Sequence, residues 1–147
     1  MSNLTIYPIY NIRGIMNAWN MVCDGLNRIL SFTYKDTNMT KVYNDLLGGN
    51  LLLWVIYIDG EYKGFMTTKI EEVPEEGRIL WIVHLYGKDF SKEILLDGLG
   101  RIEKFAREQN CNTIRFLSMR EEAFEKRLKD MGFFKGYTEF IKEISNV

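Results

Sequence analysis

Two β-rich runs joined by a short turn constrain the fold of this chain more than any other feature. The stretch LLLWVIYIDGEYKGFMTTKIEEV runs from Leu51 to Val73, with Asp59–Gly60 near its centre. An Asp-Gly pair between two runs of strand-forming residues is a strong short-range signal for a β-hairpin, because both residues accept a positive φ. The sequence therefore predicts an antiparallel hairpin near the middle of the chain.

A third strand and a helix are expected after this hairpin. A turn at EVPEEGR precedes ILWIVHLYG (Ile79–Gly87), which is apolar on both faces, as is typical of a central strand. An amphipathic helix is predicted from about Ser91 to Gln109, with its apolar face formed by Leu95, Leu99, Ile102 and Ala106. TIRFLSM then predicts a returning strand, so a β-α-β unit follows a three-strand meander.

The two ends of the chain complete the order of elements. LTIYPIY predicts a short edge strand, because Pro8 cannot donate a ladder hydrogen bond. Two helices should follow, the second with Asn38 as its N-cap and Gly48–Gly49 at its end. REEAFEKRLKDMG predicts a helix ended by Gly132, and FFKGYTEFIKEI a final strand or strand pair. This order excludes a plain doubly wound fold and a helix bundle. The apolar stripe of the first helix consists of Ile15, Trp19, Val22, Leu26 and Ile29.

Composition and charge narrow the class of protein. The 147 residues suit one domain, 1–147, and no linker or repeat divides them. Net charge is −1, with 7 basic and 9 acidic residues before Lys88 and 12 and 11 from there on, so neither half is typical of a nucleic-acid binder. Cys23 and Cys111 are far apart, and with His84 as the one histidine they do not predict a metal site. We expect two buried, reduced thiols in an intracellular setting.

The sequence predicts no membrane span. The longest apolar run, LLLWVIYI, is far shorter than the ~20 residues that cross a bilayer as a helix. The stretch MSNLTIYPIY lacks a basic segment followed by an apolar one, so no signal peptide is expected. We therefore expect the protein to stay in the compartment where it is made.

The predicted order of elements resembles the GNAT superfamily, whose members move an acyl group from acyl-CoA to an amine. VIYIDGEYKGFMTTKI is similar to the second and third strands of that family, with an acid-Gly turn and an early Gly in the later strand. RIEKFAREQNCNTIRF resembles its central helix and the strand behind it, and RLKDMGF resembles the end of its last helix. The likeness spans about Leu51 to Ile144. It implies an α+β (α/β) fold, with a mixed central sheet of about six to seven strands and helices on both faces.

Within that superfamily, the chain looks most similar to GNAT-like proteins encoded among phage structural genes. The shared features are an apolar strand, a short charged loop, an IEKFAREQNC-like helix, a strand and a degenerate helix ending in Gly-Phe. This resemblance implies a structural, assembly or internal virion protein. Such a protein is made in the cytoplasm of the host cell, and its partners are other virion subunits or copies of itself.

The family's cofactor loop is altered here. In the family, the pyrophosphate of acyl-CoA sits on backbone N–H groups at the amino end of the central helix, and glycines allow its close approach. By the resemblance, the leading Arg/Gln position is Phe90, and the two Gly positions are Glu93 and Leu95. The Glu93 carboxylate would repel a pyrophosphate, and the Leu95 side chain would hinder its close approach to the backbone. Lys92 offsets part of that charge, and Ser91 suits an ordinary N-cap.

Two further positions that bind coenzyme or act in catalysis in the family are also altered in this chain. The Asn that often contacts the CoA arm corresponds to Glu121, and the Tyr that often protonates the leaving thiolate corresponds to Leu128. Leucine has no proton to donate, so the usual general acid is missing. Three departures at independent positions argue against the family's conventional mechanism.

Other side chains offer only weak substitutes. His84 and Tyr86 share a face of the predicted central strand; His84 is either a general base or a hydrogen-bonded core residue, and Tyr86 either lines a cleft or packs on a helix. Nothing in the spacing of Tyr43 or Tyr137 indicates a catalytic role. The many aromatic residues belong either to the core or to a protein interface, the tryptophans being Trp19, Trp54 and Trp81.

We therefore expect a non-catalytic, GNAT-fold binding or assembly protein with no cofactor and no metal. The alternatives are an active acyl-CoA-dependent N-acetyltransferase with an unusual cofactor loop, and a sensor that binds acyl-CoA without chemistry. No catalytic residue is assigned. If acyl-CoA binds, the residues expected to contact it are Leu85, Tyr86, Lys88, Ser91, Lys92 and Ile94.

Overall fold

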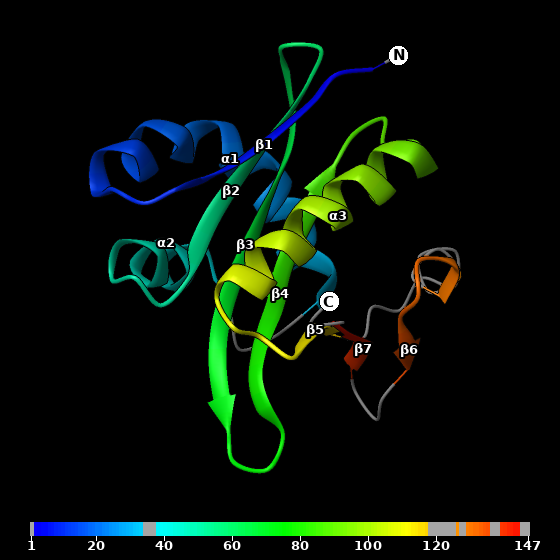
Figure 1. Ribbon diagram of the computed structural model, residues 1–147. Helices are drawn as coiled ribbons and strands as arrows, with labels where there is room; N and C mark the ends of the chain where they lie inside the picture. The colour runs from blue at the N-terminus through cyan, green and yellow to red at the C-terminus, as the bar shows by residue number, and fades with distance from the viewer. Residues whose placement is uncertain (1, 34–37, 118–125, 127–128, 136–138, 145–147) are drawn as a thin grey trace. The chain divides into compact units, whose positions relative to one another are not determined.

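The computed structural model describes residues 2–33, 38–117, 126, 129–135 and 139–144 (Figure 1). Its strands follow the order β1-β2-β3-β4-β5-β7-β6, with β4 and β5 parallel, so the expected mixed sheet is confirmed. None of the described helices combines the length and apolar character that a bilayer crossing needs. The strands are β1 (Leu4–Ile9), β2 (Leu52–Ile58), β3 (Glu61–Val73), β4 (Gly77–Gly87), β5 (Thr113–Leu117), β6 (Phe134–Lys135) and β7 (Glu139–Glu143), and the helices are α1 (Ile12–Thr33), α2 (Met39–Leu47) and α3 (Lys92–Glu108).

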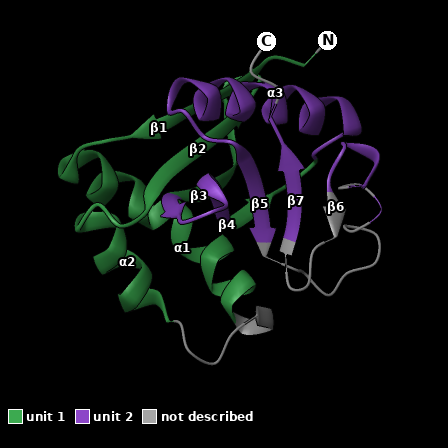
Figure 2. Ribbon diagram, turned by 60° about the horizontal axis from the view of Figure 1, so that its bottom comes forward, with its two compact units in different colours: residues 1–69, 84–89 green, residues 70–83, 90–147 purple. Residues whose placement is uncertain are grey.

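The chain divides into two compact units, shown in different colours in Figure 2. Unit 1 consists of Met1–Lys69 and His84–Asp89, and unit 2 of Ile70–Val83 and Phe90–Val147. Strands β3 and β4 each contribute residues to both units. The single domain expected over 1–147 stays a prediction.

The hairpin around Asp59–Gly60 lies in unit 1. Asp59 and Gly60 have φ values of 52° and 81°, as a tight turn between β2 and β3 requires. Pro8 lies on the edge strand β1, opposite Trp54 of β2. The predicted hairpin and the predicted edge strand are both confirmed.

The helices of unit 1 are also close to expectation. The predicted stripe of α1 faces the core: Ile15, Val22 and Leu26 are buried, and the others are half-buried. Asn38 caps α2, its side-chain oxygen accepting a hydrogen bond from the Lys41 N–H at 2.9 Å. The helix ends at Gly48, as predicted.

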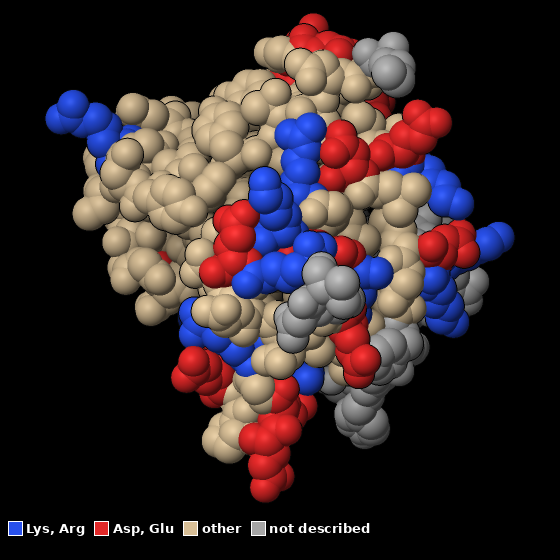
Figure 3. All heavy atoms as spheres, viewed as in Figure 1, with Lys and Arg blue, Asp and Glu red and all other residues tan. Residues whose placement is uncertain are grey.

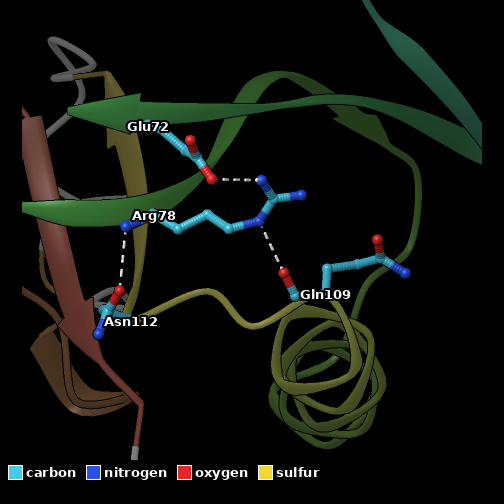
Figure 4. Close-up of polar contacts among 4 residues, drawn as sticks. All are labelled: Glu72, Arg78, Gln109 and Asn112. Carbon is cyan, nitrogen blue, oxygen red and sulfur yellow. Dashed lines mark hydrogen bonds and ion pairs between the residues drawn. The ribbon is translucent and has the colours of Figure 1, made fainter.

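In unit 2, Arg78 at the start of β4 is bonded to the end of β3 and to the connection between α3 and β5 (Figure 4). Its Nε donates to the Gln109 carbonyl oxygen at 2.7 Å, and its Nη1 lies 3.0 Å from Oε1 of Glu72. Its backbone N–H donates to Oδ1 of Asn112 at 3.0 Å. These contacts hold the residues after α3 beside the β3–β4 turn.

Helix α3 begins and ends within a residue of its predicted bounds. Ile102 and Ala106 are buried as expected, but the first-turn residue that enters the core is Ile94, while Leu95 and Leu99 are half-buried. The predicted face was therefore rotated by one position at the amino end of the helix.

The rest of unit 2 is described in part. The final segment forms two antiparallel strands, β6 and β7, and Gly132 before them has a φ of 93°. Of the helix expected over 120–132, residues 120–125 and 127–128 lie outside the described residues, as do the last two residues, 118–119, of the strand expected before it.

The two cysteines are free. Cys111 is buried as expected, whereas Cys23 on α1 is only half-buried, which corrects the expectation of two buried thiols. Burial raises the pKa of both thiols.

Candidate functional site

The amino end of α3, in unit 2, is the position where the family resemblance puts a pyrophosphate. Ser91 is the N-cap, as predicted: its Oγ accepts a hydrogen bond from the Ile94 N–H at 3.1 Å. The Ser91 carbonyl oxygen accepts from the Leu95 N–H at 3.0 Å, which closes the first helical turn. One of the amides that would face an anion is thus already bonded to the protein's own side chain.

The first turn of α3 carries two charged side chains of its own, Lys92 and Glu93. Glu93 lies exposed in the first turn, where the positive end of the helix dipole favours its carboxylate. Lys92 beside it is exposed as well, while the Ile94 side chain is buried and Phe90 is half-buried. The helix end therefore presents an acidic and a basic side chain of its own to solvent.

The first turn of α3 differs from the glycine-rich cradle that the resemblance implies for a pyrophosphate. It contains no glycine, the Ile94 N–H is bonded to the Ser91 side chain, and the exposed Glu93 carboxylate lies in the same turn. The loop before it carries a further acidic residue, Asp89, with a φ of 61°.

Three other predicted contact residues lie at the end of β4, in unit 1. Leu85 is half-buried and Lys88 is exposed, with the Lys88 N–H donating to the Lys63 carbonyl oxygen at 2.9 Å. Tyr86 packs on Phe65, with ring centroids 6.1 Å apart, and lies against Gly25 of α1. Tyr86 thus packs on a helix, which was one of its two expected roles.

The six predicted contact residues are split between the units. Leu85, Tyr86 and Lys88 belong to unit 1, and Ser91, Lys92 and Ile94 to unit 2. Contact with acyl-CoA stays a prediction for all six.

His84 is a core residue. It is buried, and its Nδ1 lies 2.7 Å from Oγ1 of Thr67. Burial lowers its pKa to about 4, against a smaller opposing effect of Asp45. A histidine with this pKa is neutral at pH 7 but too weak a base for efficient amine deprotonation.

Most of the other candidate side chains have structural roles. The Tyr43 ring packs at a tilt on Trp19, with centroids 4.7 Å apart. Trp54 is a core residue whose Nε1 donates to Oγ1 of Thr68 at 2.9 Å. The part of the chain that the structure describes holds no cluster of three His, Cys, Asp or Glu residues suited to a metal ion. Glu121, Leu128 and Tyr137 lie outside the described residues.

Sequence reasoning missed a row of tyrosines on successive strands of unit 1. Tyr7 stacks on Tyr57 with centroids 6.1 Å apart, and Tyr57 meets Tyr62 edge-on at 6.1 Å. The Tyr62 hydroxyl is buried without a hydrogen-bond partner among the described residues. Burial, followed by the neighbouring Tyr86 and Tyr57, raises its pKa to about 12, so it stays protonated. The signal was available, since Tyr57 and Tyr62 flank the Asp59–Gly60 turn and a hairpin pairs them.

The comparisons with known proteins find relatives in structure only. No protein-family model and no curated protein matches the chain. A probable acetyltransferase from Staphylococcus epidermidis superposes with a TM-score of 0.67 at 13% identity, covering 99% of this chain and 100% of that one. A predicted acetyltransferase from Clostridium acetobutylicum with acetyl-CoA gives 0.65 at 15% identity, covering 93% and 92%.

A third solved structure agrees with these two. The PaiA N-acetyltransferase from Thermoplasma acidophilum, in complex with coenzyme A, gives a TM-score of 0.61 at 17% identity and covers 96% of this chain and 99% of that one. Identities this low carry information on the fold alone. Together with the strand order and the β4-α3-β5 unit, they show that this chain has the fold of the GNAT acetyltransferases.

Proposed function

We propose that this protein uses the GNAT fold to bind a protein partner and does not transfer an acyl group. The observation that supports this most directly is the first turn of α3. There the Ser91 Oγ accepts a hydrogen bond from the Ile94 N–H, and the Glu93 carboxylate lies in the first turn, where the helix dipole favours an anion. A coenzyme pyrophosphate bound there would have to displace the Ser91 side chain from the Ile94 N–H and lie close to the Glu93 carboxylate.

Two structural neighbours favour an alternative. The Clostridium acetobutylicum protein was solved with acetyl-CoA and the Thermoplasma acidophilum enzyme with coenzyme A. In this chain Lys88 and Lys92 are exposed cations that would attract phosphates. An acyl-CoA-dependent N-acetyltransferase with an unusual loop is therefore the second candidate. Its cofactor contacts would be the six residues given above.

The setting of the first candidate rests on the sequence resemblance alone. A virion-associated assembly or internal protein, with other virion subunits as partners, suits a GNAT fold without a working cofactor end. We keep that setting as part of the proposal.

We expect millimolar acetyl-CoA to leave the melting temperature unchanged. A ligand at 100 times its dissociation constant stabilises a protein by about 2.7 kcal/mol. For a domain of this size that amounts to a shift of roughly 6–10 °C. Differential scanning fluorimetry with acetyl-CoA, and with desulfo-coenzyme A as a second probe, measures the shift.

A matched pair of variants tests the role of the carboxylate. Glu93→Gln removes a negative charge at the amino end of α3, and Glu108→Gln removes one at the carboxyl end of the same helix. Both glutamates are exposed. Coenzyme binding gained by Glu93→Gln and not by Glu108→Gln supports the blocking role of Glu93. A shift of several degrees in the wild-type protein, with transfer of labelled acetyl to an amine, contradicts the proposal and favours the second candidate.

A further inference from the structure

Buried polar side-chain atoms without a hydrogen-bond partner gather on two neighbouring strands of unit 2. Among the described residues four such atoms occur, and three of them belong to β4 and β5. These three are Nε1 of Trp81, Oγ1 of Thr113 and Nε of Arg115. Buried polar groups are nearly always hydrogen-bonded, so three unsatisfied ones on adjacent strands indicate a partner from outside the chain.

The register of β4 and β5 places these three side chains on one face of the sheet. The two strands are parallel, and Trp81 lies opposite Arg115. Positions 113 and 115 are two apart on one strand and therefore point to the same side, and a residue directly opposite shares that side. The guanidinium carbon of Arg115 lies 5.9 Å from the centroid of the Trp81 ring. We call Trp81, Thr113 and Arg115 together the Arg115 cluster.

One edge of the Arg115 guanidinium is open among the described residues. Its Nη1 donates to Oε1 of Glu76 at 3.0 Å. The neighbouring edge is formed by Nε and Nη2, and Nε has no partner. Two parallel N–H groups on such an edge match the two oxygens of a carboxylate. The Trp81 ring beneath the guanidinium holds its plane in place.

The unpaired groups of the cluster require a hydrogen-bond acceptor. An indole N–H and a guanidinium N–H can only donate, and the Thr113 hydroxyl can donate as well. A metal ion accepts no hydrogen bond, so it does not fit these donors. Because Arg115 is a buried cation, an anionic acceptor gains more from it than a neutral one does.

Acidic residues near the cluster limit the charge of that anion. Glu76 already pairs with Arg115. Glu143 of β7 lies opposite Thr113, so its side chain is on the same face of the sheet. Figure 3 shows acidic side chains at the lower end of the view, where Figure 1 places the β3–β4 turn. Both glutamates are exposed and screened by water, so a monoanion is tolerated, whereas a phosphate with up to two charges is repelled more strongly.

The burial of the cluster limits the size of the ligand. Thr113 is 8% exposed and Arg115 9%, so a protein or nucleic-acid surface cannot reach them. Ile79, which lies opposite Thr113, is fully buried and adds an apolar wall. The side chain of Glu76 is 49% exposed, so the cluster approaches solvent at the β3–β4 turn. A small molecule with a short apolar part suits these surroundings.

We propose that the Arg115 cluster binds the carboxylate of a small monocarboxylic acid. The Nε–Nη2 edge of Arg115 donates two hydrogen bonds to the carboxylate, and Trp81 Nε1 and the Thr113 hydroxyl donate the others. The cluster lies where β4 and β5 are paired and not in the first turn of α3. The inference therefore goes beyond the proposed binding of a protein partner and holds whether or not α3 binds a coenzyme.

Two-dimensional NMR of ¹⁵N-labelled protein tests the site. The probes are butyrate, its neutral analogue butyramide, and inorganic phosphate. Millimolar butyrate is expected to shift one of the three indole N–H signals, namely the one that is missing in Trp81→Phe. Butyramide should leave this signal in place, and phosphate should bind more weakly than butyrate.

Three variants test the role of each charge. Arg115→Lys keeps a cation beside Glu76 but removes the open edge, and should raise the dissociation constant of butyrate at least ~10-fold. Glu76→Gln removes the competing carboxylate and should lower that constant about 2–5-fold. The matched control is Glu75→Gln, which removes an exposed negative charge from the same turn and should leave the constant unchanged.

Each other outcome contradicts the proposal. If butyrate leaves the Trp81 signal in place, an internal water molecule satisfies the three groups and the cluster is structural only. Equal shifts with butyramide indicate apolar contact, and tighter binding of phosphate indicates a general anion site. Equal gains in Glu75→Gln and Glu76→Gln indicate an effect of overall charge. Circular dichroism melting shows whether each variant is folded, and if Arg115→Lys is not, the two glutamate variants still decide.

Discussion

Replacing Gly64 with alanine is expected to lower the free energy of unfolding by about 3 kcal/mol, the upper end of the usual cost of overpacking. Gly64 on β3 lies against the end of β4, and a Cβ there would overlap the Tyr86 carbonyl oxygen and lie 2.9 Å from the Gly87 Cα. These neighbours are main-chain atoms, so no change of side-chain rotamer relieves the collision. Urea denaturation followed by circular dichroism measures the loss, or shows that the variant does not fold.

Gly100→Ala is the matched control for this substitution. Gly100 lies in α3 and is exposed, and a Cβ added there would have no neighbouring atom within 4 Å. An alanine in a helix interior stabilises by roughly 0.5–1 kcal/mol relative to glycine. If Gly64→Ala proves as stable as the wild-type protein, the close approach of β3 and β4 in unit 1 is wrong.

Stability is expected to fall by up to about 3 kcal/mol between pH 6.5 and pH 4 because of His84. Its pKa is about 4 in the folded protein, compared with 6.5 for an unperturbed histidine. Below pH 6.5 the unfolded chain binds a proton that the folded chain does not, so the free energy of unfolding decreases as pH falls. The stabilisation that comes from burying neutral His84 is fully present above pH 6.5 and is lost by about pH 4.

His84→Gln isolates this effect, because the chain has one histidine. Carboxylates also titrate in acid, and they do so in both proteins. Denaturation curves at several pH values should therefore show a steeper decline for the wild-type protein than for the variant between pH 6.5 and 4. Parallel declines would mean that His84 is not held neutral by burial against Thr67.

Much of the local structure could be predicted because it depends on residues close in sequence. The turn at Asp59–Gly60 requires two positive φ values, which aspartate and glycine accept, and both are observed. The caps at Asn38 and Ser91 follow from a side-chain oxygen three residues before an amide. The order and spacing of these elements were also enough to predict the GNAT fold.

The candidate site was predictable in its position but not in its full geometry. The sequence located the start of α3 and placed Glu93 in its first turn. It did not show that Ile94, rather than Leu95, enters the core, since one position of rotation changes the apolar pattern only slightly.

Residues far apart in the chain meet only through strand register and helix packing. These contacts were therefore decided by the tertiary structure. Gly64 was expected as an early glycine of its strand, yet its reason, the backbone of Tyr86 and Gly87, lies more than 20 residues away. His84 had two open roles until Thr67 was placed beside its ring. The sequence by itself determined the turns, the caps and the order of elements, because these are local choices of backbone conformation. Which apolar residues stay uncovered on β1 and α1 was decided by packing, because exposure depends on what the rest of the chain covers.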